Sequence, residues 1–224
     1  MMAVEGSRHL TAIPLLGKIV ARGSDRLFAR RFIPALHQLH DVLDGTELAG
    51  RYWVWAGMLL GWAREGRLLT HDRDADFALL PGDLPKLFRA VPALRMAGFH
   101  PLQIFRNNDG DVTEVTLCRR TAKFEFFVME PVDGMLRYYV YGRLPDRLIE
   151  VEARVAEQEL VPFEFLGRTW QRHADYEGEL KSMYGDWRTP QRSWDYLQDD
   201  QAVVSRRTWT NSDESWSGWT RWMR

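Results

Sequence analysis

The stretch LLTHDRDADFALL, residues 68–80, constrains the fold of this chain more than any other segment. Its ends are apolar, as in a buried strand, whereas Asp72, Asp74 and Asp76 recur at every second position. Successive side chains of a strand alternate between its two faces, so the three carboxylates would share one face, with neighbours roughly 6.5–7 Å apart. Aspartate is disfavoured in strands and like charges on one face repel each other. A positive group must therefore compensate these residues.

The acidic spacing has three interpretations. An EF-hand loop needs Gly at its sixth position and usually Glu at its twelfth, but Phe77 and Asp83 stand there, so this interpretation fails. A strand with solvent-facing acids is an alternative, because edge strands do carry charges. The third interpretation is a cation site, since clustered carboxylates suit magnesium or manganese. Glu125 in the apolar run 122–130 is available as a further ligand, and its carboxylate would be costly to bury without a cation or donors.

The composition limits the partners of the chain. Its 224 residues suit one domain, or one domain with an appendage. The formal net charge of -1 gives no basic surplus for nucleic acid, and Cys118, the only cysteine, excludes an intrachain disulfide. The apolar segment 10–20 is too short and too interrupted to span a membrane and lacks a convincing cleavage site. We therefore expect a cytoplasmic protein, and peripheral membrane contact through this segment remains an alternative.

Other chemistries find little support. His37, His40 and Asp41 have close spacing, but a third convincing zinc ligand is missing, which favours a surface or capping role. The chain contains no G-x-S-x-G, no Walker-type phosphate loop and no G-x-G-x-x-G.

The remaining patterns predict mixed helix and strand. Helices are expected over about 24–43, after residue 57 up to Gly66, from Asp83 to before Gly98 with a break at Pro92, and over 176–185. Strands are expected over 51–57, around the Asp-Gly turn within 100–120, and over 122–130, 135–144 and 161–170.

These elements suggest three parts: an N-terminal segment 1–23, a catalytic domain 24–197 and a Trp-rich tail 198–224. We expect the tail to be weakly ordered or to lie as an arm on the surface. Trp216, Trp219 and Trp222 recur at a spacing of three. A packed terminal helix, stacking on a sugar and an interfacial membrane contact are all open for them.

One combination of motifs is more specific. Gly57, two aliphatic residues, Gly61 and Arg64 precede the aspartates, and KFEFF follows at 123–127. Together they closely resemble the signature of the LicD/fukutin family of nucleotidyltransferase-fold phosphotransferases. FEFLGRTW and LKSMYGDWRTP resemble the family's closing strand and helix, so the resemblance covers roughly residues 30–196. Two features depart from it: Glu125 stands where the family usually has Asp, and WQRHAD replaces a Val-Pro segment.

The resemblance implies an α/β (α+β) fold, a nucleotidyltransferase-like mixed sheet flanked by helices, with a short C-terminal arm. It implies Mg²⁺ or Mn²⁺ as cofactor, held by catalytic acids on two strands, and a glycine-rich turn with basic residues against the donor phosphates. The implied catalytic and metal residues are Asp74, Asp76 and Glu125, the donor residues are Gly57, Gly61, Arg64, His71 and Lys123, and Asp72 supports them.

The implied activity is that of a LicD-type phosphotransferase. A phospho-alcohol group, phosphocholine or an alditol phosphate, would pass from a CDP-activated donor to a hydroxyl of a glycan or lipid-linked sugar, releasing CMP. We expect this at the inner face of the membrane, on a cell-envelope precursor. The alternatives are a D-x-D glycosyltransferase using a nucleotide sugar, a small-molecule nucleotidylyltransferase, and a non-catalytic glycan-binding protein.

Overall fold

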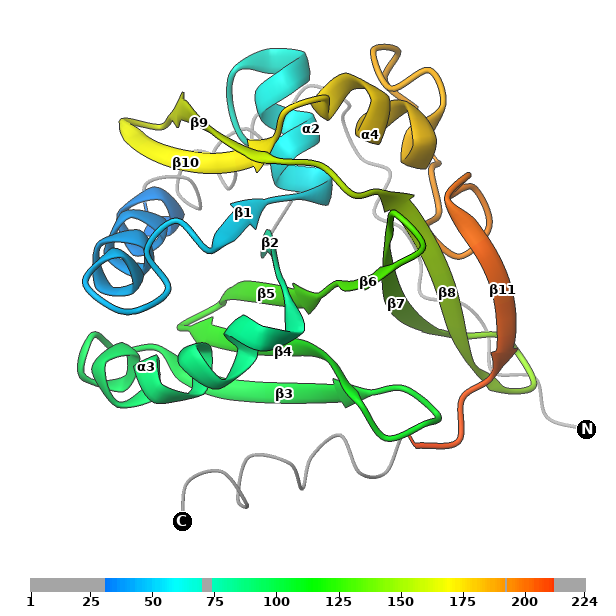
Figure 1. The fold of residues 1–224 in the computed structure, drawn as a ribbon, viewed down its shortest axis with the longest axis horizontal. Coiled ribbons are helices and arrows are strands. Elements are labelled where there is room, and N and C mark those ends of the chain that lie inside the picture. Colours follow the sequence, from blue (N-terminus) through cyan, green and yellow to red (C-terminus); the bar gives the residue numbers. More distant parts are fainter. Residues whose placement is uncertain (1–30, 70–73, 192, 212–224) are drawn as a thin grey trace, which may run out of the picture.

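The computed structural model describes residues 31–69, 74–191 and 193–211. Within these ranges the strands form three sheets, and helices pack around them (Figure 1). The chain has an α+β fold, as the sequence predicts.

The largest sheet has five strands in the order β1-β2-β5-β4-β3. β2 and β5 run parallel, whereas the other neighbours are antiparallel, so this sheet is mixed. Its strands are β1 (Tyr52–Val54), β2 (Asp74–Leu79), β3 (His100–Arg106), β4 (Val112–Arg119) and β5 (Ala122–Val128).

One face of the β2–β5 pair builds the main core. Phe77 of β2 and Phe126 of β5 stack with ring centroids 5.1 Å apart, and Phe77 also stacks on Trp170 at 5.6 Å. Phe124 stacks on Phe32 of the helix over residues 31–44. Burying one such ring is worth roughly 1.5–3 kcal/mol, and a register slip by one residue would put carboxylates in its place. The core therefore fixes which side chains β2 and β5 present on the opposite face.

The helices begin and end for local reasons. α2 ends at Gly66, which adopts φ 64° as a left-handed cap. The break predicted at Pro92 is wrong: Pro92 lies inside α3, whose Leu87 and Leu94 are buried on both sides of it. This burial outweighs the one helical hydrogen bond that a proline cannot donate.

No helix in the described ranges combines the length and apolar character that crossing a bilayer requires. Besides the helix over 31–44, the helices are α2 (Ala56–Glu65), the short 3₁₀ helix η1 (Pro81–Asp83), α3 (Leu84–Met96) and α4 (Tyr176–Tyr184).

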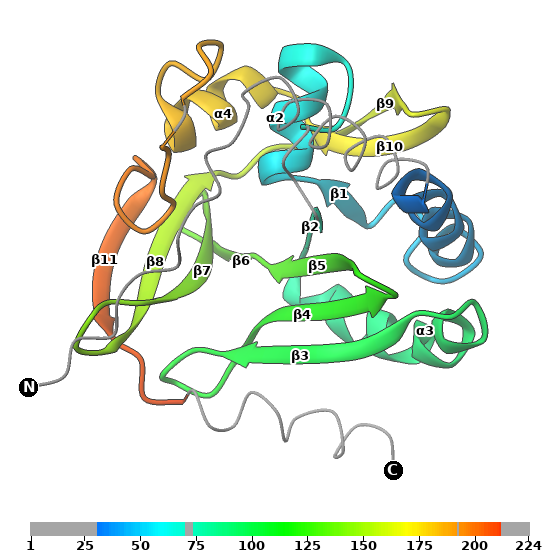
Figure 2. The ribbon, with the colours of Figure 1, turned by 180° about the vertical axis from the view of Figure 1, so that it is seen from behind.

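A second, antiparallel sheet lies beside the first in the order β11-β8-β7-β6 (Figures 1 and 2). β9 and β10 form a separate hairpin next to β1 and α2. The strands are β6 (Glu130–Val132), β7 (Met135–Arg143), β8 (Leu148–Ala156), β9 (Leu160–Phe165), β10 (Arg168–His173) and β11 (Val203–Thr208).

β11 defines part of the C-terminal segment, for which a weakly ordered tail or an arm on the surface was expected from residue 198. β11 pairs with β8 from Val203 to Thr208, with most of its residues exposed, and Trp209 after it is buried, so these residues form an ordered arm. This pairing gives the edge of β8 backbone hydrogen-bond partners. The sequence of β11 is short and polar, so it did not indicate a strand. The predicted contacts of Trp216, Trp219 and Trp222 and the segment 1–23 lie outside the described residues.

The two close histidines dock a helix on the β9–β10 hairpin. Nε2 of His37 lies 2.6 Å from the carbonyl oxygen of Leu166, and Nε2 of His40 lies 2.9 Å from that of Thr169. Each imidazole thus ties the helix over 31–44 to the backbone of the hairpin.

Gly61 in α2 allows a close backbone contact. A Cβ at this position would lie 2.7 Å from the carbonyl oxygen of Arg67 and 3.0 Å from the amide nitrogen of Leu69. We predict that Gly61→Ala lowers the free energy of unfolding by roughly 1–3 kcal/mol, because rigid backbone atoms must move. Urea denaturation measures this change. Gly82→Ala, where nothing lies within 4 Å of the added Cβ, is the control; equal stability of the two variants would contradict the prediction.

Candidate active site

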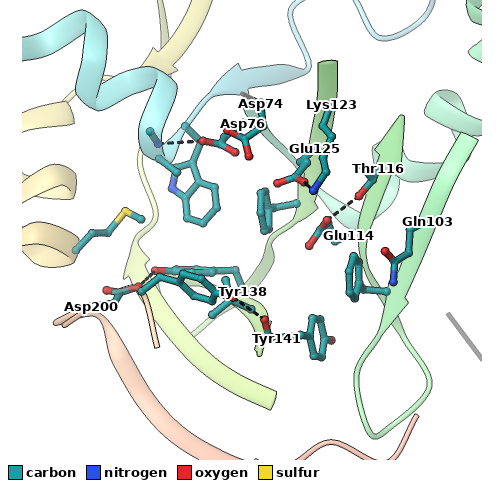
Figure 3. A pocket seen from close by; sticks show the side chains of 18 of the residues that line it. Asp74, Asp76, Gln103, Glu114, Thr116, Lys123, Glu125, Tyr138, Tyr141 and Asp200 are labelled. Atoms are coloured by element: carbon teal, nitrogen blue, oxygen red, sulfur yellow. Dashed lines mark hydrogen bonds and ion pairs between the residues drawn. The ribbon is translucent and has the colours of Figure 1, made fainter. Parts of the chain in front are cut away.

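A cavity of about 520 Å³ opens between the acidic face of the five-stranded sheet and the second sheet. Figure 3 shows its two sides: carboxylates of β2, β4 and β5 on one, and Tyr138, Tyr141 and Asp200 on the other. Residues far apart in the sequence therefore meet in one space.

The predicted acids come together here. β2 and β5 are parallel, and their register places Asp76 beside Glu125 and Asp74 beside Lys123. All four side chains line the cavity (Figure 3). The alternation within each strand, combined with this pairing, produces the shared acidic face that the sequence predicts.

Asp76 also caps the N-terminus of α2. The amide of Gly57 donates to Oδ2 of Asp76 over 3.0 Å, and the amide of Trp55 donates to its backbone carbonyl over 3.1 Å. The N-cap residue of α2, Trp55, makes no side-chain cap of its own. A carboxylate at a helix N-terminus satisfies an otherwise unpaired amide and interacts favourably with the helix dipole. Gly57 thus lines the cavity, and its predicted role in binding the donor stays a prediction.

Glu125 of β5 is largely buried, with its side chain 17% exposed. Burial raises the pKa of the Glu125 carboxyl, and the negative charge of Asp74 raises it further. The ammonium of Lys123, 3.6 Å from Oε1 of Glu125, opposes this shift only in part. The cavity wall therefore disfavours the ionised form of Glu125 unless a further positive group reaches it.

The donor set fits a hard divalent cation in its chemistry. Carboxylate oxygens are the ligands that magnesium and manganese prefer, and magnesium is often held by one or two of them together with phosphate oxygens and water. In residues 31–69, 74–191 and 193–211, no three His, Cys, Asp or Glu side chains converge closely enough to form a ready-made metal site. The metal role of Asp74, Asp76 and Glu125 stays a prediction.

A comparison with protein families bears on this geometry. The LicD/FKTN/FKRP nucleotidyltransferase domain matches residues 50–142. This part of the chain belongs to the LicD/FKTN/FKRP family. The LicD domain spans the whole five-stranded sheet and ends within β7. Family membership indicates, in general terms, a transferase of the phosphotransferase type that modifies glycans. No curated protein matches the chain in a sequence search.

The LicD domain contributes one acid that sequence analysis missed. Glu114 of β4 is buried, lines the cavity and accepts a hydrogen bond from the hydroxyl of Thr116 over 2.8 Å. Burial, and next the negative charge of Glu125, raises the pKa of the Glu114 carboxyl to about 8. A carboxylate inside the apolar run of β4 was the available signal, the same one that identified Glu125.

Two predicted donor-binding residues of the LicD domain lie elsewhere. Arg64 does not line the cavity: its guanidinium donates two hydrogen bonds to the carbonyl oxygen of Trp187, one of them over 2.8 Å, and holds the segment after α4. Gly61 is buried against residues 67–69, so its lack of a side chain serves packing. His71 and Asp72 lie outside the described residues.

The wall opposite the acids combines residues of the LicD domain with residues that follow it. The hydroxyl of Tyr138 donates to Asp200 over 3.1 Å, and the amide of Ala202 also donates to that carboxylate. The hydroxyl of Tyr196 donates to the carbonyl oxygen of Tyr141 over 3.0 Å. Asp200 belongs to the predicted tail, yet it lines the cavity, so the boundary drawn at residue 197 divides this wall.

The raised pKa of Glu114 makes stability depend on pH. The folded state holds this proton more tightly than the unfolded state, whose pKa is near 4.5. Unfolding free energy should therefore fall as pH rises from about 4.5 to about 8, because ionising the buried group is costly. We predict that Glu114→Gln flattens this fall by roughly 1–2 kcal/mol between pH 5 and pH 8.

Denaturant titrations at several pH values test this prediction. Glu164→Gln, which changes an exposed carboxylate of β9, is the matched control and should follow the wild type. Parallel pH profiles of wild type and Glu114→Gln would show that the Glu114 carboxyl ionises normally.

Proposed function

We propose that this protein transfers a phospho-alcohol group from a CDP-activated donor to a glycan hydroxyl in a metal-dependent reaction that releases CMP. The observation that carries the proposal is the meeting of Asp74, Asp76 and Glu125 on one face of the parallel β2–β5 pair, inside the cavity of a LicD domain. An acidic wall of this kind has to be neutralised before it can receive the phosphates of a nucleotide donor.

In the proposed site, Asp74 and Asp76 hold the magnesium or manganese ion, with Glu125 as a further ligand. When bound, the ion offsets the charge of the donor diphosphate and the charge that develops during transfer. Lys123 lies beside Asp74 at the cavity, where its ammonium contacts a donor phosphate. Gly57 fixes the orientation of Asp76 through its amide.

The reaction is an in-line substitution at the phosphorus that bears the alcohol. The acceptor hydroxyl oxygen forms a new bond to this phosphorus, and the bond from phosphorus to the bridging oxygen breaks, so that CMP leaves with the bond electrons. In this proposal the hydroxyl proton passes to a cavity carboxylate, a role that Glu125, which lines the cavity, takes if it does not complete the metal site. The products are a glycan phosphodiester and CMP.

The lining of the cavity favours choline over an alditol as the transferred alcohol. Five carboxyl groups line it, and Lys123 is the one Lys or Arg side chain among its described lining residues. Aromatic rings such as Tyr138 and Tyr184 form part of the opposite wall, together with Asp200. Aromatic faces and carboxylates together attract a quaternary ammonium group, whereas a neutral polyol gains nothing from this charge.

Calorimetric titration with CDP, CMP, UDP and ADP, with and without magnesium, tests the donor class. Metal-dependent preference for a cytidine nucleotide, lost in Asp74→Asn, is the expected result. Preference for UDP would instead support a nucleotide-sugar glycosyltransferase. Glycan binding without any nucleotide binding would support a non-catalytic protein.

We predict that Asp74→Asn and Asp76→Asn each reduce CMP release from CDP-choline by about 100-fold or more, because each removes a charged metal ligand. Asparagine retains an oxygen that can accept the hydrogen bond from Gly57, so the fold should persist. Circular dichroism checks the fold, and Asp146→Asn, at an exposed aspartate, is the control. Substantial turnover by both cavity variants would overturn the metal assignment.

A further inference from the structure

Glu114 lies in an aromatic slot at one end of the cavity. Strand pairing places Phe127 of β5 on one side of it and Phe105 of β3 on the other, and all three side chains line the cavity. Tyr141 stacks on Phe105 with ring centroids 5.3 Å apart and an interplanar angle of 8°. The slot therefore offers flat apolar faces around one carboxyl group.

The carboxyl of Glu114 is held in place but retains capacity for a ligand. Oε1 accepts from the hydroxyl of Thr116, which is buried. Among the described residues this is the one hydrogen bond to that carboxyl, and the side chain borders the cavity (Figure 3). A buried carboxyl group is costly unless further donors reach it, so a ligand that supplies a donor is favoured.

The position of Glu114 relative to the metal-binding acids suggests which part of a donor enters the slot. β4 is two strands away from β2, and the register places Thr116 level with Asp76. Glu114 therefore lies about 10 Å across the sheet from Asp76 and two residues further along β4. The ribose of a nucleotide spans a distance of this order, with its phosphate near Asp76 and its base beside Glu114 in the slot. A planar base with flat faces matches the surrounding rings of Phe105 and Phe127.

We propose that Glu114 recognises the cytosine base of the donor by accepting a hydrogen bond from its exocyclic amino group. This inference rests on the proposed CDP donor and adds the residue that selects it. Cytosine presents an amino group where uracil presents a carbonyl oxygen. A carboxyl oxygen of Glu114 accepts from the former in either protonation state, and it repels the latter when Glu114 is ionised.

The test is calorimetric binding of CMP and UMP to the full chain in the presence of magnesium. Wild type should bind CMP roughly tenfold or more tightly than UMP, the size of one good base contact. Glu114→Gln keeps the shape of the side chain, but its amide can donate to uracil as well as accept from cytosine. We predict that it brings the two affinities within about threefold of each other. Glu164→Gln, at an exposed position of β9, should retain the wild-type ratio.

A second variant tests the slot itself. Phe105→Leu should weaken CMP and UMP alike by roughly fivefold or more, because stacking does not depend on the base edge. Unchanged affinity for both nucleotides would overturn the assignment of the base to this slot.

The outcomes separate this inference from the function on which it rests. If Glu114→Gln keeps the preference for CMP, the role of Glu114 is overturned while the CDP donor stands. If wild type shows no preference for CMP over UMP, both the cytidine donor and the role of Glu114 are overturned.

Discussion

The parallel pairing of β2 with β5 determines most of what this molecule can do. Its register places Phe77 and Phe126 together on the core face, and the same register places Asp76 beside Glu125 on the cavity face. The stability gained by burying the rings holds carboxylates next to each other that would otherwise repel. The fold thus supplies the free energy that keeps an acidic cavity wall in place, and this pair of strands lies inside the LicD domain.

The acidic face could be predicted from the sequence because it depends on local alternation. Asp74, Asp76 and Glu125 each interrupt an apolar run, and two strands suffice to place them. Glu114 shows the same local signal, but its proximity to Glu125 depends on the register of a third strand. Neither spacing nor composition fixes that register, since it follows from the β4–β5 hairpin as a whole.

The remaining differences come from tertiary contacts between distant segments. Asp200 joins the cavity through Tyr138, 62 residues earlier in the chain, and a polar stretch gives no sign of such a partner. The family resemblance assigned Arg64 to the donor phosphates, yet the carbonyl of Trp187 accepts from its guanidinium. In both cases the residue type indicated a side chain that forms hydrogen bonds, but it did not indicate the partner. The partner depends on how distant segments of the chain pack together.

The hydrogen bond from Gly57 to Asp76 links the cavity wall to the first turn of α2. Since Trp55 offers no cap of its own, the start of this helix depends on a carboxylate from a different element. Any cation that draws electron density from that carboxylate weakens it as an acceptor for the amide. The same helix thus joins two distant parts of the chain: its first turn is capped by a carboxylate of the cavity wall, and Arg64 near its other end tethers the segment at Trp187.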